Sequence, residues 1–233
     1  MIDRLEFAPP VPVLLPISGS DVKFPVKRIF CVGRNYADHA REMGFEVDRE
    51  APFYFTKPSL CYAPSGGTIA YPPGTQNCHY EMELVVALGT AVYRESPDQV
   101  IYAPFGYCCG LDMTRRDLQI AARDKGRPWD MGKAFEQSAV LAPITPRMEF
   151  GELAGKTIEL KLNGETKQSA TLDDMIWSVP ELISHLSHYY HLQPGDLIFT
   201  GTPAGVGPVK PGDRLVGSIP GCAPVEITIG EPD

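Results

Sequence analysis

Apolar positions in this chain come mostly in short runs separated by turn residues, a pattern typical of a protein built from many strands. These runs predict strands over the following segments: Arg28–Val32, Phe53–Lys57, Phe105–Leu111, Asp196–Thr200 and Val225–Ile229. Asn163-Gly164 stands between Thr157–Leu162 and Glu165–Ser169, and it predicts a hairpin with a type I′ turn. Glycine and proline, with 22 and 23 residues, punctuate the runs without forming a low-complexity tract.

Helical periodicity is limited to short segments. Helices are predicted over Asn35–Met43, over Arg115–Lys125 and from Val179 to about His191. Asp112 or Thr114 would cap the second of these helices. The third carries an apolar stripe formed by Leu182, Ile183, Leu186 and Tyr190.

The order of these elements indicates the fold class. Strands outnumber helices and do not alternate with them regularly, so a doubly wound parallel sheet is not expected. We predict a single β-rich α+β domain over residues 26–233, which is long enough to bury a sizeable core. The proline-rich residues 1–25 are expected to form an extended arm over its surface.

Composition narrows the class of partner and the compartment. A formal net charge of −8 argues against nucleic acid as the main partner. The six cysteines show no C-x-x-C spacing, which favours small buried thiols in a reducing cytoplasm over a zinc ribbon or disulfide framework. The first residues lack the features of a signal peptide, and no apolar stretch is long enough to span a membrane.

The most informative polar residues stand at the start of an apolar run. Glu83 stands directly before the run Leu84–Leu88, and Glu81 stands two residues before Glu83. A strand is predicted over His79–Leu88. Residues two apart on a strand point to the same face, with Cα atoms roughly 6.5–7 Å apart. Two such carboxylates repel each other unless a cation lies between them. A hard divalent cation, Mg²⁺ or Mn²⁺, is one interpretation; an edge strand whose glutamates face solvent is the other.

Asp112 would supply a third carboxylate. It follows the predicted strand Phe105–Leu111 at a strand-to-helix junction, where functional groups are often held in place while solvent can still reach them. Three carboxylates, with waters or substrate oxygens, would complete an octahedral site for Mg²⁺. An ordinary helix cap is the alternative role for Asp112.

A second group of residues could act on a substrate held at such a site. His39 and Glu42 are three residues apart on one predicted helix, so the carboxylate could orient the imidazole as a base that activates water. Lys133 is the only charge in Met131–Phe135, a context that sets it apart from most surface lysines. Further candidates for binding an acidic substrate or stabilising an oxyanion are Lys57, Arg116 and Gln119.

Other motifs give weaker signals. The loop Gly201–Gly207 fails the nucleotide-binding glycine patterns, although its amides and the Thr202 hydroxyl could approach a carboxylate. His185, His188 and His191 are spaced in threes and drift around a helix, so surface histidines are favoured over a zinc site. His79, two residues before Glu81, could support the site without binding a ligand.

Four blocks of this sequence, in order, resemble the fumarylacetoacetate hydrolase family over roughly residues 26 to 229. The first is Cys31-Val32-Gly33-Arg34-Asn35-Tyr36-Ala37-Asp38-His39 and the second is His79-Tyr80-Glu81-Met82-Glu83-Leu84; the third and fourth are Gly110-Leu111-Asp112-Met113-Thr114-Arg115-Arg116-Asp117 and Asp196-Leu197-Ile198-Phe199-Thr200-Gly201-Thr202-Pro203. Within the family, the segments 41–45 and 126–129 look most like those of fumarylpyruvate hydrolases, with acylpyruvases also similar. Tyr80 departs from the pattern, since many relatives carry a histidine there.

The resemblance implies a mixed β-roll, a homodimer and a Mg²⁺ or Mn²⁺ site at Glu81, Glu83 and Asp112. It implies His39 and Glu42 as the pair that activates water and Lys133 as the stabiliser of an oxyanion or enolate. The substrate contacts that it implies are Arg34, Lys57, Arg116, Gln119 and Thr202.

The chemistry that follows from the resemblance is hydrolysis of the C–C bond of a 2,4-diketo acid. Fumarylpyruvate, a substrate of aromatic (gentisate) catabolism, would give fumarate and pyruvate. Two alternatives on the same site are decarboxylation of oxaloacetate and isomerisation or decarboxylation of 2-hydroxyhepta-2,4-diene-1,7-dioate, since each passes through an enolate. The His39–Glu42 pair favours hydrolysis, because the other reactions need no activated water. A non-catalytic binding protein that retains the fold is the alternative from another class.

Overall fold

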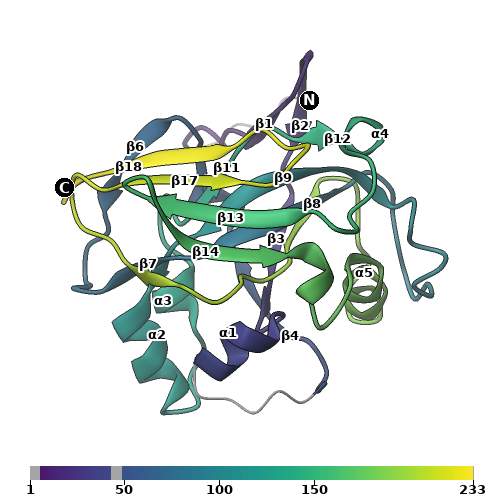
Figure 1. The fold of residues 1–233 in the computed structure, drawn as a ribbon. Helices are drawn as coiled ribbons and strands as arrows, with labels where there is room; N and C mark the ends of the chain where they lie inside the picture. The colour runs from purple at the N-terminus through teal and green to yellow at the C-terminus, as the bar shows by residue number, and fades with distance from the viewer. Residues whose placement is uncertain (1–5, 43–48, 233) are drawn as a thin grey trace.

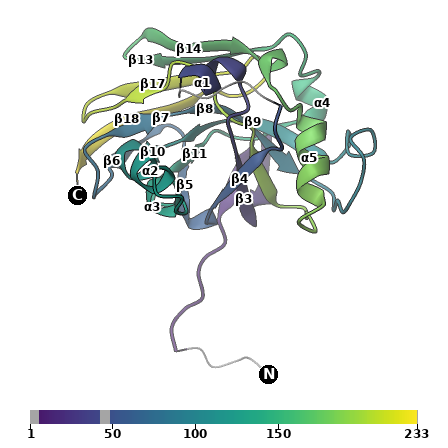
Figure 2. The ribbon, with the colours of Figure 1, turned by 90° about the horizontal axis from the view of Figure 1, so that it is seen from below.

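The computed structural model describes residues 6–42 and 49–232. Within these ranges the chain forms two large β-sheets, of eight and five strands, which curl around a shared core as a half-barrel (Figures 1 and 2). The short helices α1 (Ala37–Glu42), α2 (Arg116–Arg123) and α3 (Asp130–Lys133) gather at one end of this roll (Figure 1). The predicted β-rich α+β fold with few short helices is confirmed.

The larger sheet carries most of the candidate site. Its order is β4-β3-β15-β8-β9-β11-β5, and β12 pairs with β9. Its strands are β3 (Arg28–Gly33), β4 (Phe53–Lys57), β5 (Tyr62–Pro64), β8 (Met82–Leu88), β9 (Pro104–Asp112), β11 (Ala139–Leu141), β12 (Thr145–Pro146) and β15 (Asp196–Phe199). The four sequence predictions that fall on β3, β4, β9 and β15 are confirmed to within one residue at each end.

Strand β8 lies in the middle of this sheet and is buried along its whole length. Met82, Leu84 and Val86 face the core between the two sheets, whereas Val85 and Ala87 face a second apolar cluster on the far side of the sheet. Pairing with β15 and β9 satisfies both edges of β8, and the two apolar clusters cover its two faces. The continuous apolar run therefore reflects a strand buried on two faces.

The smaller sheet closes the roll. Its order is β14-β13-β17-β18-β6, and its strands are β6 (Gly67–Tyr71), β13 (Thr157–Leu162), β14 (Glu165–Thr171), β17 (Arg214–Ser218) and β18 (Val225–Pro232). Asn163 and Gly164 join β13 to β14, which confirms the predicted hairpin. The predicted strand Val225–Ile229 is present and continues to Pro232.

The predicted single strand over His79–Leu88 is wrong. The chain forms β7 (Cys78–Tyr80) and β8, which break at Glu81 and belong to different sheets. Strand β7 pairs with β10 (Thr114–Arg115) and β16 (Gly207–Pro208) in a small sheet of its own. These partners lie far from β7 in sequence, so the local apolar pattern could not reveal the break.

The helices are shorter than predicted. Helix α1 ends at Glu42, and Met43 lies outside the described residues. Helix α2 begins after Arg115, and neither Asp112 nor Thr114 caps it, because Thr114 belongs to β10 and its hydroxyl donates to the Asp112 carbonyl. The remaining helices are α4 (Arg147–Phe150), α5 (Val179–Ser187) and the 3₁₀ turns Ser59–Cys61 and Leu172–Asp174.

Helix α5 buries Leu182, Ile183 and Leu186 as predicted, but it does not continue to His191. Tyr190 lies beyond its end, 42% exposed, with its ring centroid 5.0 Å from that of Phe30. Its place on the apolar stripe of the helix was therefore wrong.

The N-terminal region is more structured than an extended arm. Strands β1 (Leu14–Ile17) and β2 (Ser20–Pro25) form a hairpin, and Leu15 and Phe24 join the second apolar cluster. Residues 6–13 run away from the body of the molecule (Figure 2). The β1–β2 hairpin therefore packs on the outer face of the larger sheet.

The cysteines behave as predicted. All six are free; Cys222 is half-buried and the others are buried. Burial raises the pKa of Cys31 and Cys108 well above the ordinary value, so these thiols stay protonated. No helix among the described residues is long and apolar enough to cross a membrane.

Candidate active site

Three carboxylates meet at one end of the larger sheet. Glu81 lies in the break between β7 and β8, Glu83 is the second residue of β8, and Asp112 ends the neighbouring strand β9. One oxygen from each lies within 4.8 Å of the others, and all three side chains are buried. The alternative interpretation, an edge strand whose glutamates face solvent, is therefore wrong. The structure brings together the three residues that the sequence proposed as metal ligands.

Two lysines lie among these carboxylates. Lys57 Nζ is 2.8 Å from Asp112 Oδ1, and Lys133 Nζ is 2.7 Å from both Glu81 Oε2 and Asp112 Oδ2. The third donor of Lys133 reaches the Thr114 hydroxyl, also at 2.7 Å. The side chains of both lysines are almost fully buried, 0% and 2% exposed, so neither charge is compensated by water.

The charges of Glu81 and Lys133 support each other. Burial alone would raise the pKa of Glu81, but Lys133 and Arg116 outweigh burial and hold the pKa of Glu81 below its ordinary value. Burial likewise opposes the charge on Lys133, but Asp112 and Glu81 raise its pKa above the ordinary value. Glu81 is therefore ionised and Lys133 is protonated at neutral pH.

Glu83 lacks such support. Burial raises the pKa of Glu83 well above its ordinary value, and the negative charges of Asp112 and Glu81 raise it further. Its carboxylate accepts one backbone hydrogen bond, at 2.6 Å, from the Gly201 amide. The ionised form of Glu83 therefore needs a further positive charge nearby.

A hard divalent cation fits this cluster. The donors are carboxylate oxygens, which Mg²⁺ and Mn²⁺ prefer. Asp112 Oδ1 is buried and makes no hydrogen bond of good geometry, although Lys57 lies beside it. An ion held by Glu81, Glu83 and Asp112 would supply the charge that Glu83 lacks and a partner for this oxygen.

A histidine faces the carboxylates from helix α1. His39 is 6% exposed, and its Nδ1 lies 3.3 Å from Glu42 Oε2. In the tautomer in which Nδ1–H donates to Glu42, Nε2 is free to accept a proton. Burial lowers the pKa of His39 below its ordinary value, even though Glu81 and Glu42 act in the opposite direction. The imidazole is thus neutral near pH 7, as a base must be.

The Gly201–Gly207 loop holds this pair in place. The Gly205 amide lies 3.2 and 3.1 Å from the two Glu42 carboxylate oxygens, and the Gly201 amide contacts Glu83. Both glycines have positive φ, 95° and 96°. The sequence predicted that amides of this loop could approach a carboxylate. The carboxylates that they contact are those of Glu42 and Glu83, which belong to the protein itself.

Replacing Gly205 by alanine should disturb the His39–Glu42 pair. A Cβ at this position would lie 2.0 Å from the Lys167 carbonyl oxygen, and φ is unfavourable for any L side chain. We expect a loss of about 1–3 kcal/mol of stability and a fall of roughly tenfold in kcat.

The matched control is Gly212→Ala, because Gly212 also has positive φ (89°) but an added Cβ would meet nothing within 4 Å. Denaturant unfolding and steady-state kinetics measure the two effects. If both variants lose activity equally, the amide of Gly205 does not position Glu42.

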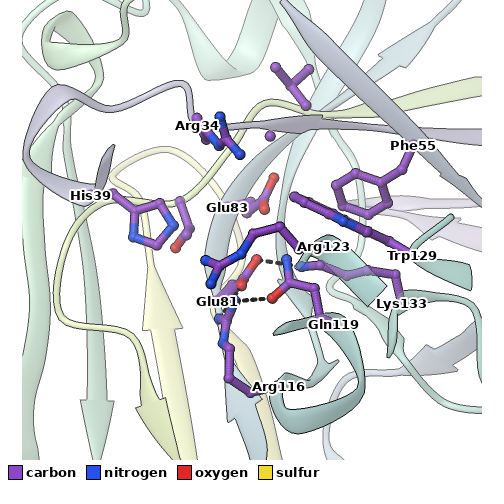
Figure 3. Close-up of a pocket in the computed structure, with 13 residues that line it drawn as sticks. Arg34, His39, Phe55, Glu81, Glu83, Arg116, Gln119, Arg123, Trp129 and Lys133 are labelled. Atoms are coloured by element: carbon purple, nitrogen blue, oxygen red, sulfur yellow. Dashed lines mark hydrogen bonds and ion pairs between the residues drawn. The ribbon is translucent and has the colours of Figure 1, made fainter. Parts of the chain in front are cut away.

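The other predicted substrate contacts divide into two groups. Arg116, Gln119, Thr202 and Arg34 line one cavity together with His39, Glu81, Glu83 and Lys133 (Figure 3). Lys57 does not line it and lies behind Asp112, where it contacts the carbonyls of Met113 and Lys133. Its predicted role as a substrate contact stays a prediction, and its contacts assign it to the support of Asp112.

Arg116 is held at the inner end of the cavity. Its guanidinium contacts Glu81 and the Gln119 side-chain oxygen, while Nε lies 3.5 Å from His79 Nδ1. Burial lowers the pKa of His79 to about 4, and the Arg116 charge contributes to this shift. His79 therefore stays neutral and can accept this contact, which agrees with a supporting role.

The cavity is also lined by residues that the sequence did not identify as part of a site. Val32, Phe55 and Trp129 give it an apolar wall, and Arg123 reaches into it from the end of α2 (Figure 3). Phe55 and Trp129 pack with ring centroids 5.8 Å apart. Val32 and Trp129 lie in segments that carry the family resemblance, but no local pattern assigned any of these four residues to a cavity, because the fold alone brings them together.

Comparison with known proteins agrees with this geometry. The family model described as "Fumarylacetoacetate (FAA) hydrolase C-terminal" matches residues 28–230. The chain belongs to the fumarylacetoacetate hydrolase family. All of the carboxylates, the histidine and the lysines described above lie within the matched region.

Individual members of the fumarylacetoacetate hydrolase family are similar over most of their length. A fumarylpyruvate hydrolase of Ralstonia sp is 53% identical over 190 residues, which cover 81% of this chain and 98% of that protein. The mitochondrial oxaloacetate tautomerase FAHD1 of Homo sapiens is 40% identical over 207 residues, 89% of this chain and 93% of that one.

A solved structure is also similar. The fumarylpyruvate hydrolase from Pseudomonas aeruginosa, in complex with Mn²⁺ and pyruvate, matches with a TM-score of 0.95 and 47% sequence identity. The match covers 98% of this chain and 100% of that chain. This family member therefore has the same fold throughout.

Proposed function

We propose that this protein hydrolyses the C–C bond of a 2,4-diketo acid, with fumarylpyruvate as the substrate and fumarate and pyruvate as the products. The observation that carries the proposal is the cavity that His39, Glu81 and Glu83 line together, with Asp112 completing the carboxylate cluster and Glu42 in contact with the histidine. The prediction of an enzyme that hydrolyses C–C bonds is confirmed by its similarity to the two fumarylpyruvate hydrolases. A role in aromatic catabolism, in the cytoplasm, is part of the proposal.

Glu81, Glu83 and Asp112 would hold the divalent cation, Mg²⁺ or Mn²⁺. When bound, the ion supplies positive charge that favours formation of an enolate from the pyruvate end of the substrate. The Arg116 guanidinium and the Gln119 amide offer N–H donors to the substrate carboxylate at that end. The Thr202 hydroxyl, which accepts a hydrogen bond from Gln168 at 2.8 Å, can donate its own proton to a substrate oxygen.

His39 would begin the reaction by removing a proton from water. The water oxygen adds to the distal carbonyl carbon, and the bond from that carbon to the central methylene then breaks. The electron pair goes to the methylene, which leaves as the enolate of pyruvate, and the acyl part leaves as a carboxylic acid. Return of the proton from His39 to the methylene gives pyruvate. Lys133 is held protonated among the carboxylates, and its positive charge would stabilise the negative charge on the enolate oxygen.

A second candidate is the interconversion or decarboxylation of oxaloacetate. It is favoured by the 40% identity to the oxaloacetate tautomerase, whose name gives a substrate that also forms an enolate. Isomerisation or decarboxylation of 2-hydroxyhepta-2,4-diene-1,7-dioate belongs to the same group of reactions. None of these reactions uses the attacking water that His39 and Glu42 are placed to activate, so hydrolysis accounts for more of the site.

The test is removal and return of the metal, followed by assay on a small panel. Dialysis against EDTA should abolish release of pyruvate from fumarylpyruvate, and Mg²⁺ or Mn²⁺ should restore it. Oxaloacetate, assayed for tautomerisation and for decarboxylation, is the comparison substrate. Turnover of oxaloacetate alone would favour the second candidate, and metal binding without any turnover would indicate a non-catalytic protein.

The homodimer stays part of the proposal. Sedimentation at several protein concentrations would measure it directly, and a monomer at assay concentrations would contradict it.

A further inference from the structure

A fully buried glutamine connects the smaller sheet to the candidate active site. Gln168 is 0% exposed, whereas the other residues of β14 are exposed or half-buried. Glutamine is seldom buried completely, because its carboxamide loses free energy on leaving water unless its donors and its acceptor find partners. The partners of this carboxamide therefore indicate why a glutamine is retained at this position.

The Gln168 carboxamide bonds two segments of the site at once. Its Oε1 accepts from the Met82 amide at 3.0 Å, and its Nε2 donates to the Thr202 hydroxyl and to the Pro203 carbonyl, both at 2.8 Å. Met82 lies between the two glutamates of the carboxylate cluster, and Thr202 lines the cavity. The side chain thus ties the backbone between two proposed metal ligands to the loop that carries a proposed substrate contact.

These partners fix the orientation of the carboxamide. A backbone amide only donates and a carbonyl only accepts, so the contacts with Met82 and Pro203 allow one assignment of the Gln168 oxygen and nitrogen. The Thr202 hydroxyl must then accept from Nε2, which leaves its own proton for another acceptor. Within residues 6–42 and 49–232, no protein group accepts this proton. A ligand oxygen in the cavity would be its partner.

The backbone of β14 reinforces this connection. The pairing of β14 with β13 shifts register here, because Leu160 pairs with Gln168 but the next residue of β13 pairs with Thr166. Lys167 is thus the extra residue of a β-bulge, and its carbonyl oxygen would lie 2.0 Å from a Cβ added to Gly205. Bulges change the direction of side chains and are common beside active sites. This bulge brings Gln168 and the Lys167 carbonyl to the same loop.

We propose that Gln168 is a positioning residue, which fixes the backbone between two metal ligands and turns the Thr202 proton toward a substrate oxygen. This inference rests on the proposed function and extends the site to the smaller sheet. Gln168 does not line the cavity, so it acts through the Met82 amide and the Thr202 hydroxyl. Outer contacts of this kind orient the groups that bind a metal and its ligands.

The kinetic experiment uses the full-length protein with saturating Mn²⁺. Gln168→Met keeps the length of the side chain and removes the carboxamide, whereas Thr202→Val keeps the shape and removes the hydroxyl. Each change should lower kcat/KM for fumarylpyruvate by about 10–100-fold, as expected for a hydrogen bond to a charged group. The double variant should lose about as much as the greater single loss, rather than the product, because both changes remove the same contact.

Two binding measurements separate positioning from a loss of stability. Isothermal titration should show Mn²⁺ affinity lowered by about tenfold in Gln168→Met and unchanged in Thr202→Val, because Gln168 alone contacts the Met82 amide. Binding of pyruvate to the Mn²⁺-loaded protein should weaken in both variants, since both affect the Thr202 proton.

Ile158→Ala is the matched control for stability. Ile158 is also 0% exposed and lies on β13, the strand paired with β14, but its side chain is apolar. The variant should lower the urea midpoint of unfolding because it leaves a cavity, and it should keep both affinities within about twofold.

Gln168→Asn serves where the methionine variant does not fold. It keeps an amide but is one methylene too short to bond both segments, so it should show the same losses and the same coupling to Thr202→Val.

The outcomes separate the two proposals. Multiplicative losses in the double variant, or unchanged Mn²⁺ and pyruvate binding in Gln168→Met, would overturn the positioning role and leave the hydrolase intact. If the wild-type protein cleaves no fumarylpyruvate but the binding changes appear, the proposed function fails and the positioning role stands. A wild-type protein that binds neither Mn²⁺ nor pyruvate would overturn both.

Discussion

Replacing Asp112 by asparagine should lower kcat/KM by about a thousandfold or more and the free energy of unfolding by about 3–5 kcal/mol. The catalytic loss is expected because a neutral amide is a poor ligand for a hard divalent cation. The loss of stability is expected because Lys57 and Lys133 both pair with Asp112 in a region closed to water. Removing one partner of a buried ion pair leaves the other charge uncompensated.

The two effects can be measured separately. Isothermal titration with Mn²⁺ reports the loss of metal affinity, and urea unfolding of the metal-free protein reports the loss of stability. Asp196→Asn is the matched control, since Asp196 is equally buried and pairs with Arg28 at the opposite end of the larger sheet. It should reduce stability, because Arg28 loses its partner, but it should keep Mn²⁺ affinity. Asp112→Asn with near wild-type Mn²⁺ affinity would exclude Asp112 as a ligand.

Local sequence patterns predicted much of the larger sheet but not its breaks. Strand β9 is a mostly apolar run that is buried except at Phe105, whereas β4 is only partly buried and is marked by its aromatic residues and by the proline that follows Lys57. Glu81 interrupts the run at β7 because Cys78–Tyr80 pairs with β10 and β16, which lie far away in the chain. The prediction that Glu81 and Glu83 lie close together, made from the alternation of side chains along a strand, still agrees with the structure. The chain passes from one sheet to another at Glu81, but both carboxylates lie at the same end of the larger sheet.

The candidate site shows the same division between local and distant information. Glu81, Glu83, Asp112 and the His39–Glu42 pair were identified from spacing and from the resemblance to a family. The contact between Glu42 and the Gly205 amide spans 163 positions, and no short motif encodes it. The sequence did not assign Arg123 or Trp129 to the cavity, which they reach only because α2 packs against α3 and α3 packs against β4. Residues that act through distant contacts need the fold to be recognised.

Replacing His39 by alanine should reduce kcat for fumarylpyruvate by about 10²–10⁴-fold, the usual contribution of a general base. The reason is that His39 is the imidazole that lines the cavity, and Glu42 keeps its Nδ1 side occupied. Mn²⁺ affinity should change little, because His39 is not among the three clustered carboxylates. His188→Ala, at the exposed end of α5, is the matched control and should retain activity.

The pH profile gives a readout that a structural role for His39 would not change. A base must be neutral to accept a proton, so wild-type kcat/KM should fall only as the pH drops through the pKa of His39. Burial lowers that pKa below 6.5, and the acid limb of the profile should therefore lie below pH 6.5. In the His39→Ala protein this limb should disappear, and the residual rate should rise with hydroxide concentration. A variant that keeps both its rate and its acid limb would mean that another group activates the water.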